Sequence, residues 1–236
     1  MILVNGQPAE TVDALDRGLA YGDGVFRTLR TRAGQPVWWR DQYAKLATDC
    51  SALMLACHEE AGLHAEVCRV AEAGEGVVKI LMTRGVGARG YALPQGQATT
   101  RIVLSAPLPA CAQAGSPDAV TARWCTLRLA RQPRLAGIKH LNRLENVLAR
   151  AEWNDPDIVE GLLCDDSGAV IGGVMSNLLM VKDGELLTPD LSQCGVAGVA
   201  RTRLLRAAAR LGMRIHIGRL LPDAILAADE VMISNS

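Results

Sequence analysis

Short apolar runs separated by turn residues dominate the start of the chain. Ile2 to Val4 precedes Asn5-Gly6, and Val25 to Thr31 precedes Ala33-Gly34 and the run Pro36 to Trp39. Apolar runs that flank such dipeptides are typical of β-hairpins, because these residues tolerate the positive φ angles of tight turns. The pattern therefore predicts two hairpins at the start of the chain.

Apolar residues then recur at helical spacing in two segments, from Arg40 to Leu55 and from Glu59 to Ala73. Strand-like runs follow at Val77 to Thr83 and Arg101 to Ser105. Together with the hairpins, these segments predict an N-terminal α+β domain over residues 1–110.

Proline and glycine concentrate at about 107–117, which predicts a linker there. Beyond the linker the apolar pattern alternates again between strand and helix periods. Strands or helices are predicted at residues 120–127, 141–153, 161–164, 177–181 and 201–211. We therefore expect a second, α/β domain over residues 118–236.

Composition narrows the class of protein. Of the 236 residues, 49% are hydrophobic and 21% charged, which is enough apolar material for globular domains with packed cores. Acidic and basic residues both number 25, so the net charge favours a small-molecule substrate over nucleic acid. No apolar run reaches membrane-spanning length and the first residues lack a signal-peptide pattern, so we expect a cytoplasmic protein with no membrane partner.

The metal-ligating and disulfide-forming residues show no organised spacing. Cysteines number seven, an odd count, and none forms a C-x-x-C pair. The four histidines are equally dispersed. The sequence therefore predicts neither a disulfide framework nor a metal site.

One lysine, Lys139, stands out by its surroundings. It lies just before a predicted amphipathic helix, with His140 and Arg143 close in sequence. Burial or neighbouring cations can lower a lysine pKa until the amine attacks a carbonyl, which is the requirement of Schiff-base chemistry. The alternative is that Lys139 is a solvated surface residue, as most lysines are.

A run of small residues, Gly195 to Ala200, leads into the predicted helix that begins at Arg201. Small side chains at a helix start let backbone N–H groups reach a phosphate, and the helix dipole favours its negative charge. A simple packing turn would have the same composition, so both interpretations stay open.

Six segments together resemble the fold-type-IV pyridoxal-phosphate enzymes, the superfamily of the branched-chain aminotransferases. Their order and spacing match along essentially the whole chain: Gly18–Phe26, Arg84–Tyr91, Gly137–Arg143, Met175–Leu178, Gly198–Arg201 and Ile233–Ser236. The resemblance implies two α/β domains, pyridoxal phosphate bound at the domain interface, and a homodimer.

The resemblance also implies roles for individual residues. Lys139 would form the Schiff base with the cofactor. The phosphate of the cofactor would be held by Val199, Ala200 and Ser234, and by Lys45 at a position where the family has arginine. The substrate would be bound by Thr28, Arg89, Tyr91 and Asn235.

The match breaks at two functional positions. Gly172 occupies the place of a glutamate that bonds the pyridine nitrogen of the cofactor, and Lys45 keeps a charge but loses the bidentate geometry of arginine. The nearest acids in sequence, Asp165 and Asp166, are expected to belong to the preceding turn. Family members also continue for some tens of residues beyond the position of Ser236.

Within the superfamily, the Lys139 segment, Arg89-Gly-Tyr91 and the final Ser-Asn-Ser are most similar to the aminodeoxychorismate lyases. These enzymes release pyruvate from 4-amino-4-deoxychorismate and form 4-aminobenzoate for folate biosynthesis. Two alternatives remain: a branched-chain or D-amino-acid transaminase of the same fold, and a degenerate, non-catalytic member with impaired cofactor binding.

Overall fold

The computed structural model describes residues 1–71, 74–96, 98–108 and 119–236. The chain forms two compact units: the first takes the described residues of Met1–Ser116 together with Lys139–Asn142, and the second takes the remainder from Pro117 onward. The predicted linker at about 107–117 falls mostly on residues 109–118, outside the described residues. The predicted domain boundary, and the expected cofactor position at an interface, stay predictions.

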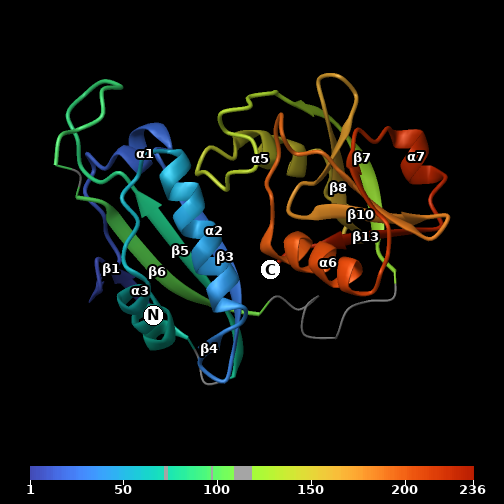
Figure 1. Cartoon of the computed structure of the whole chain (residues 1–236). Coiled ribbons are helices and arrows are strands. Elements are labelled where there is room, and N and C mark those ends of the chain that lie inside the picture. Colours follow the sequence, from blue (N-terminus) through green and yellow to red (C-terminus); the bar gives the residue numbers. More distant parts are fainter. Residues whose placement is uncertain (72–73, 97, 109–118) are drawn as a thin grey trace. The chain divides into compact units, whose positions relative to one another are not determined.

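The first unit is built on a six-stranded antiparallel sheet with the strand order β2-β1-β6-β5-β3-β4 (Figure 1). Its strands are β1 (Ile2–Val4), β2 (Gln7–Pro8), β3 (Gly24–Arg32), β4 (Gln35–Pro36), β5 (Glu75–Thr83) and β6 (Thr100–Pro107). Both predicted hairpins are confirmed. Their turn residues, Asn5-Gly6 and Ala33-Gly34, all have positive φ angles, as the tight turns of hairpins require.

The helices of this unit are α1 (Arg17–Tyr21), α2 (Trp39–Ala52) and α3 (Glu60–Val70). Helix α2 runs along β3 and α3 contacts β6 (Figure 1). The strand predicted to reach Trp39 ends at Pro36, because Trp38 takes a left-handed φ of 57° and Trp39 already begins α2.

Strand β3 alternates between a buried and a half-buried row of side chains. Val25 and Leu29 are fully buried, whereas Phe26 and Thr28 on the opposite face are half-buried. Arg27 stands in the buried row and is only 2% exposed. A charged side chain is therefore buried between Val25 and Leu29 on this face of the strand.

The second unit contains two sheets. One has the order β12-β11-β10-β13 and the other the order β7-β8-β9. The strands are β7 (Thr121–Leu129), β8 (Ile158–Asp165), β9 (Val170–Gly173), β10 (Asn177–Lys182), β11 (Glu185–Pro189), β12 (Ile215–Gly218) and β13 (Glu230–Ser234). The helices are α5 (Leu144–Arg150), α6 (Val199–Arg210) and α7 (Pro222–Leu226). Trp153, 4% exposed, anchors one core, and its indole N–H donates to the carbonyl of Ile158.

The helix predicted over residues 141–153 is shorter than expected, since α5 begins at Leu144. The preceding segment is extended and pairs with the start of β3 through two main-chain hydrogen bonds. Phe26 N–H donates to the carbonyl of Lys139 at 2.9 Å, and Leu141 N–H donates to that of Gly24 at 2.9 Å. Backbone pairing to a strand therefore overrides the helical pattern there.

A buried ion cluster fixes the loop that follows β5. The Asp23 carboxylate accepts hydrogen bonds from Arg84 at 2.8 Å and from Arg17 at 2.9 Å. Arg84 also donates to the carbonyls of Leu53 and Met54, and Arg17 donates to that of Gly90. Asp23 thus joins α1, the end of α2 and the loop after β5.

We predict that Asp23→Asn destabilises the protein by about 2 kcal/mol at neutral pH, because two buried guanidinium groups lose their shared counter-charge. Burial raises the pKa of the Asp23 carboxyl, but hydrogen bonds from Arg84 and Arg17 outweigh that effect and hold the pKa below its ordinary value of 3.8. The stabilisation is thus present above pH 3.8 and is lost as the pH falls through the lower, folded-state pKa. Urea unfolding at neutral and acidic pH checks this. If the difference in unfolding free energy between wild type and variant stays constant on acidification, the prediction is wrong.

Candidate active site

Lys139 is held by its own main chain against β3. Its carbonyl accepts from Phe26, as described above, and its N–H lies 3.4 Å from Asp49 Oδ2. The side chain then places its ammonium 4.6 Å from the centre of the Phe26 ring, within the range of a cation–π contact. The predicted Schiff-base lysine is therefore directed to the half-buried face of β3.

A second ammonium lies on the same ring. Lys79 of β5 places Nζ 5.0 Å from the centre of the Phe26 ring, and in the sheet register Lys79 stands directly opposite Thr28. The structure thus gathers Lys139, Lys79 and the predicted substrate-binding residue Thr28 around one aromatic ring. The sequence analysis missed Lys79. Its signal was the alternation of β5, which turns Lys79 to the face opposite the buried Val78 and Ile80.

Lys45, predicted to bind phosphate, lies on α2 and forms an ion pair with Asp49 one turn later. Burial lowers the pKa of the Lys45 ammonium, and Asp49 partly offsets this by raising it. Asp49 itself is 1% exposed. The same carboxylate therefore contacts both Lys45 and the main chain of Lys139.

The start of α6 has the features of an anion-binding helix N-terminus. The helix begins at Val199, two residues earlier than the sequence indicated, and its N-cap, Gly198, supplies no capping side chain. The first N–H groups of a helix have no intrahelical partners, and the first turn of α6 contains no acidic residue to neutralise them. The predicted phosphate ligands Val199 and Ala200 lie in this turn.

Asn177 holds the approach to this helix. Its side-chain amide donates to the carbonyl of Val196 at 2.7 Å, and its Oδ1 accepts from Gly198 N–H at 3.0 Å. In the sheet register Asn177 stands opposite Ser234, the third predicted phosphate ligand. The buried Ser234 hydroxyl has no hydrogen-bond partner among the described residues. An unsatisfied buried hydroxyl, together with an uncapped helix start, fits a phosphate group.

The loop before α6 is hydrogen-bonded to Gly137, which lies close to Lys139 in the sequence. Gly137 N–H donates to the carbonyl of Gly195 at 3.0 Å, and its carbonyl accepts from Ala197 N–H at 3.1 Å. Only Ile138 separates Gly137 from Lys139 in the sequence. The proposed Schiff-base residue thus follows directly on a segment bonded to the residues before α6.

The remaining predicted substrate residues are exposed and loosely held. Tyr91 is 85% exposed, with its ring centre 5.4 Å from that of Tyr21. Arg89 and Asn235 are exposed as well. Exposure alone does not test the roles of Arg89, Tyr91 and Asn235, which stay predictions.

Gly172 lies on β9, where a Cβ would come within 2.9 Å of the Ser176 carbonyl oxygen. Asp165 caps the turn before it by accepting from Ser167 and Ala169, as the sequence suggested. Glu160 is a second buried acid of this region, and its local sequence gave no signal of it.

Glu160 is occupied by the loop that follows β9. Its carboxylate oxygens accept from the N–H groups of Gly161, Val174 and Met175 and from the hydroxyl of Ser176. With its acceptor positions filled by these donors, Glu160 orders the loop and does not replace the glutamate missing at Gly172.

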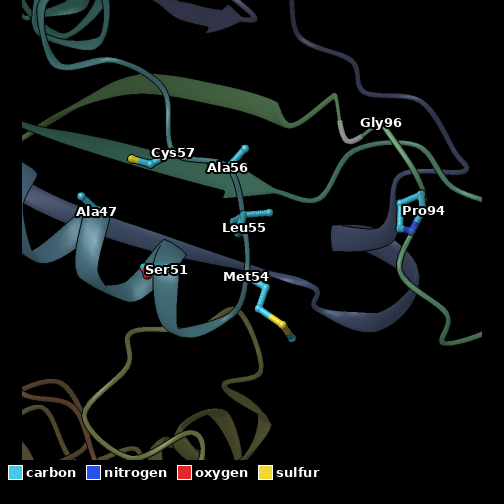
Figure 2. Close-up of a pocket in the computed structure, with 8 residues that line it drawn as sticks. All are labelled: Ala47, Ser51, Met54, Leu55, Ala56, Cys57, Pro94 and Gly96. Carbon is cyan, nitrogen blue, oxygen red and sulfur yellow. The ribbon is translucent and has the colours of Figure 1, made fainter.

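A separate surface hollow lies at the end of α2 (Figure 2). It is lined by Ala47 and Ser51 of α2, by the segment from Met54 to Cys57, and by Pro94 and Gly96. None of the predicted site residues is among them. The described lining residues carry no charged side chain.

Within the described residues, no helix is both long and apolar enough to span a bilayer. No group of three or more potential metal ligands occurs among those residues either.

Comparison with known proteins gives a consistent result. Residues 24–236 match the family model for amino-transferase class IV. The aminodeoxychorismate lyase of Vibrio harveyi is 32% identical over the whole of this chain and 88% of that protein. A putative branched-chain-amino-acid aminotransferase of Methanocaldococcus jannaschii is 28% identical, over all of this chain and 84% of that protein.

The crystal structure of 4-amino-4-deoxychorismate lyase from Pseudomonas aeruginosa superposes with a TM-score of 0.95. Its identity is 45%, and the match covers all of this chain and 87% of that one. The predicted superfamily, its mixed α/β two-domain fold and its dependence on pyridoxal phosphate are thereby confirmed. This chain belongs to the class IV aminotransferase family.

Proposed function

We propose that this chain is an aminodeoxychorismate lyase that converts 4-amino-4-deoxychorismate to 4-aminobenzoate and pyruvate, acting in folate biosynthesis as a cytoplasmic homodimer. The observation that carries the proposal is the pair of ammonium groups, Lys139 and Lys79, that both lie within 5.0 Å of the centre of the Phe26 ring. The substrate has one amine and two carboxylates. One lysine can exchange with the amine at the cofactor, while the other can bind a carboxylate.

Similarity to known proteins also favours the lyase activity. Two curated relatives, from Vibrio harveyi and Bacillus subtilis, are aminodeoxychorismate lyases at 32% and 26% identity. Transaminases of the family are also similar, at 28% identity or less among the relatives described. The lyase activity is therefore favoured.

The residues divide the work in the following way. Lys139 Nζ is the nucleophile, and once displaced by the substrate amine it removes the proton from the carbon that bears nitrogen. Pyridoxal phosphate, when bound, supplies the electron-accepting ring. Lys45, the Ser234 hydroxyl and the N–H groups of Val199 and Ala200 hold its phosphate.

Gly172 also favours the lyase over a transaminase. Gly172 supplies no carboxyl at the position where the family has a glutamate, and a cofactor with no acid at its pyridine nitrogen would be a weaker electron acceptor. Transamination depends strongly on that acceptor. Loss of pyruvate instead creates an aromatic ring, which supplies its own driving force.

A non-catalytic member is the remaining alternative. The position of Lys139 argues against it, because its carbonyl is bonded to Phe26 N–H and its ammonium is held 4.6 Å from the centre of the Phe26 ring. Arg89, Tyr91 and Asn235 remain proposed contacts of the substrate carboxylates.

Replacing Lys139 with alanine should abolish both the visible absorbance of the cofactor Schiff base and the formation of 4-aminobenzoate, because the amine proposed to bond the cofactor is removed. Lys182→Ala is the matched control, since the Lys182 side chain is 40% exposed and forms an ion pair with Asp229. The purified proteins are loaded with pyridoxal phosphate, scanned and assayed with aminodeoxychorismate. Failure of the wild type to form product, with turnover of a branched-chain or D-amino acid instead, would assign a transaminase.

Replacing Lys79 with methionine removes the charge but keeps much of the side-chain length. We expect the KM for aminodeoxychorismate to rise about tenfold or more through loss of a charged contact to a carboxylate. Absorbance of the Schiff base should be unchanged, and Lys182→Met should behave as wild type. An unchanged KM with a lower kcat would mean that Lys79 does not bind substrate.

Gly198→Ala should weaken cofactor binding about tenfold, since a Cβ at this residue would lie 2.2 Å from Asn177 Oδ1 and displace the start of α6. Gly74→Ala is the control, because a Cβ there meets no atom within 4 Å. Titration of the apoprotein with pyridoxal phosphate measures the effect. If Gly198→Ala and Gly74→Ala bind pyridoxal phosphate with equal affinity, the start of α6 is not part of the phosphate site.

A further inference from the structure

The buried Arg27 side chain belongs to neither the apolar core nor the proposed chemistry. Its guanidinium Nη2 donates to Gln42 Oε1 at 3.2 Å, while Nε and Nη1 make no hydrogen bond within the described residues. Nη1 lies 3.7 Å from Asp49 Oδ2 in an ion pair. Both side chains are almost fully buried, at 2% and 1% exposure. Burying an unpaired charge costs free energy, so a buried guanidinium is expected to interact with a charged or polar partner.

That partner carboxylate is shared. Asp49 Oδ1 contacts the Lys45 ammonium, and its Oδ2 lies near Arg27 and near the main-chain N–H of Lys139. Two cations thus compete for one anion, and the three side chains together carry one positive charge. If Arg27 were neutral, Asp49 would cancel the charge of Lys45.

The pKa of the Lys45 ammonium reflects the carboxylate that it shares with Arg27. Burial has the largest effect and lowers the pKa of its ammonium, Asp49 raises it, and Arg27 lowers it further. Arg27 therefore acts on Lys45 across the carboxylate, although it is on the opposite, buried row of β3 from Phe26 and Thr28.

We propose that Arg27 sets the affinity of the protein for the cofactor phosphate by competing with Lys45 for the Asp49 carboxylate. Arg27 is a positioning residue and touches neither cofactor nor substrate. The inference rests on the proposed function, in which Lys45 is a phosphate ligand. It adds that the lysine can take the place of the family arginine because a buried guanidinium offsets the Asp49 carboxylate, which would otherwise neutralise Lys45.

The test separates the phosphate from the rest of the cofactor. Apoprotein is titrated with pyridoxal phosphate and, separately, with pyridoxal, which lacks the phosphate. The dissociation constant for pyridoxal divided by that for pyridoxal phosphate measures how much the phosphate contributes to binding. Four proteins are compared: wild type, Arg27→Met, the conservative Arg27→Lys, and the double variant Arg27→Met with Asp49→Asn.

Arg27→Met should reduce the ratio about tenfold, as expected for one unit charge acting over several ångströms. Its pyridoxal affinity should change little. Arg27→Lys should keep most of the ratio, and the double variant should restore it, because Lys45 then has no carboxylate opposing its charge. If Arg27→Met fails to fold, Arg27→Lys and the double variant still decide: a reduced ratio in the double variant overturns the proposal.

Other outcomes are equally distinct. Equal weakening of both ligands by Arg27→Met would make Arg27 a structural residue only and overturn the inference. A wild type that shows no preference for the phosphorylated ligand, or no absorbance dependent on Lys139, would instead refute the proposed function. If the wild type prefers the phosphorylated ligand and Arg27→Met leaves the ratio of dissociation constants unaltered, only the proposed role of Arg27 is refuted.

Discussion

The account depends on the main-chain pairing between the Lys139 segment and the first residues of β3. Two hydrogen bonds, from Phe26 N–H to the Lys139 carbonyl and from Leu141 N–H to the Gly24 carbonyl, hold this segment in an isolated antiparallel bridge between His140 and Val25. Because side chains alternate along extended chains, fixing the main chain also fixes the side on which the lysine emerges. The ammonium of Lys139 consequently lies over Phe26.

The two faces of β3 then serve different purposes. One face carries Phe26 and Thr28, with the Lys79 and Lys139 ammonium groups beside the aromatic ring. The other is buried and includes Arg27, whose ion pair with Asp49 reaches the main chain of Lys139 and the Lys45 ammonium. A single strand thereby links the group proposed for covalent chemistry with the charge proposed for phosphate binding.

Much of the fold could be predicted from the sequence, because hairpin dipeptides and apolar periodicity are local signals. The Asn5-Gly6 and Ala33-Gly34 turns have the expected positive φ angles. The pattern failed at residues 141–143, where pairing with β3 decided the conformation, and at Trp38, whose left-handed φ ends the hairpin early. Both failures have non-local or conformational causes that periodicity does not encode.

The candidate site was predictable where motifs occur and not where it depends on contacts between distant residues. Local sequence was enough to single out Lys139 and the start of α6 as candidates, and the Ser234 hydroxyl has no hydrogen-bond partner among the residues that the structure describes. Lys79, 60 residues from Lys139 in the numbering, could be related to it only through the shared Phe26 ring. Arg27, Asp49 and Glu160 needed side-chain geometry to be recognised.

The central claim is that the Lys139 amine, and no other, bonds to the aldehyde carbon of pyridoxal phosphate. Reduction of the loaded protein with borohydride would make that bond permanent, and peptide mass spectrometry would locate the modified residue. The account predicts a single pyridoxyl-lysine at Lys139. Modification at Lys79 instead, or no specific modification, would contradict it.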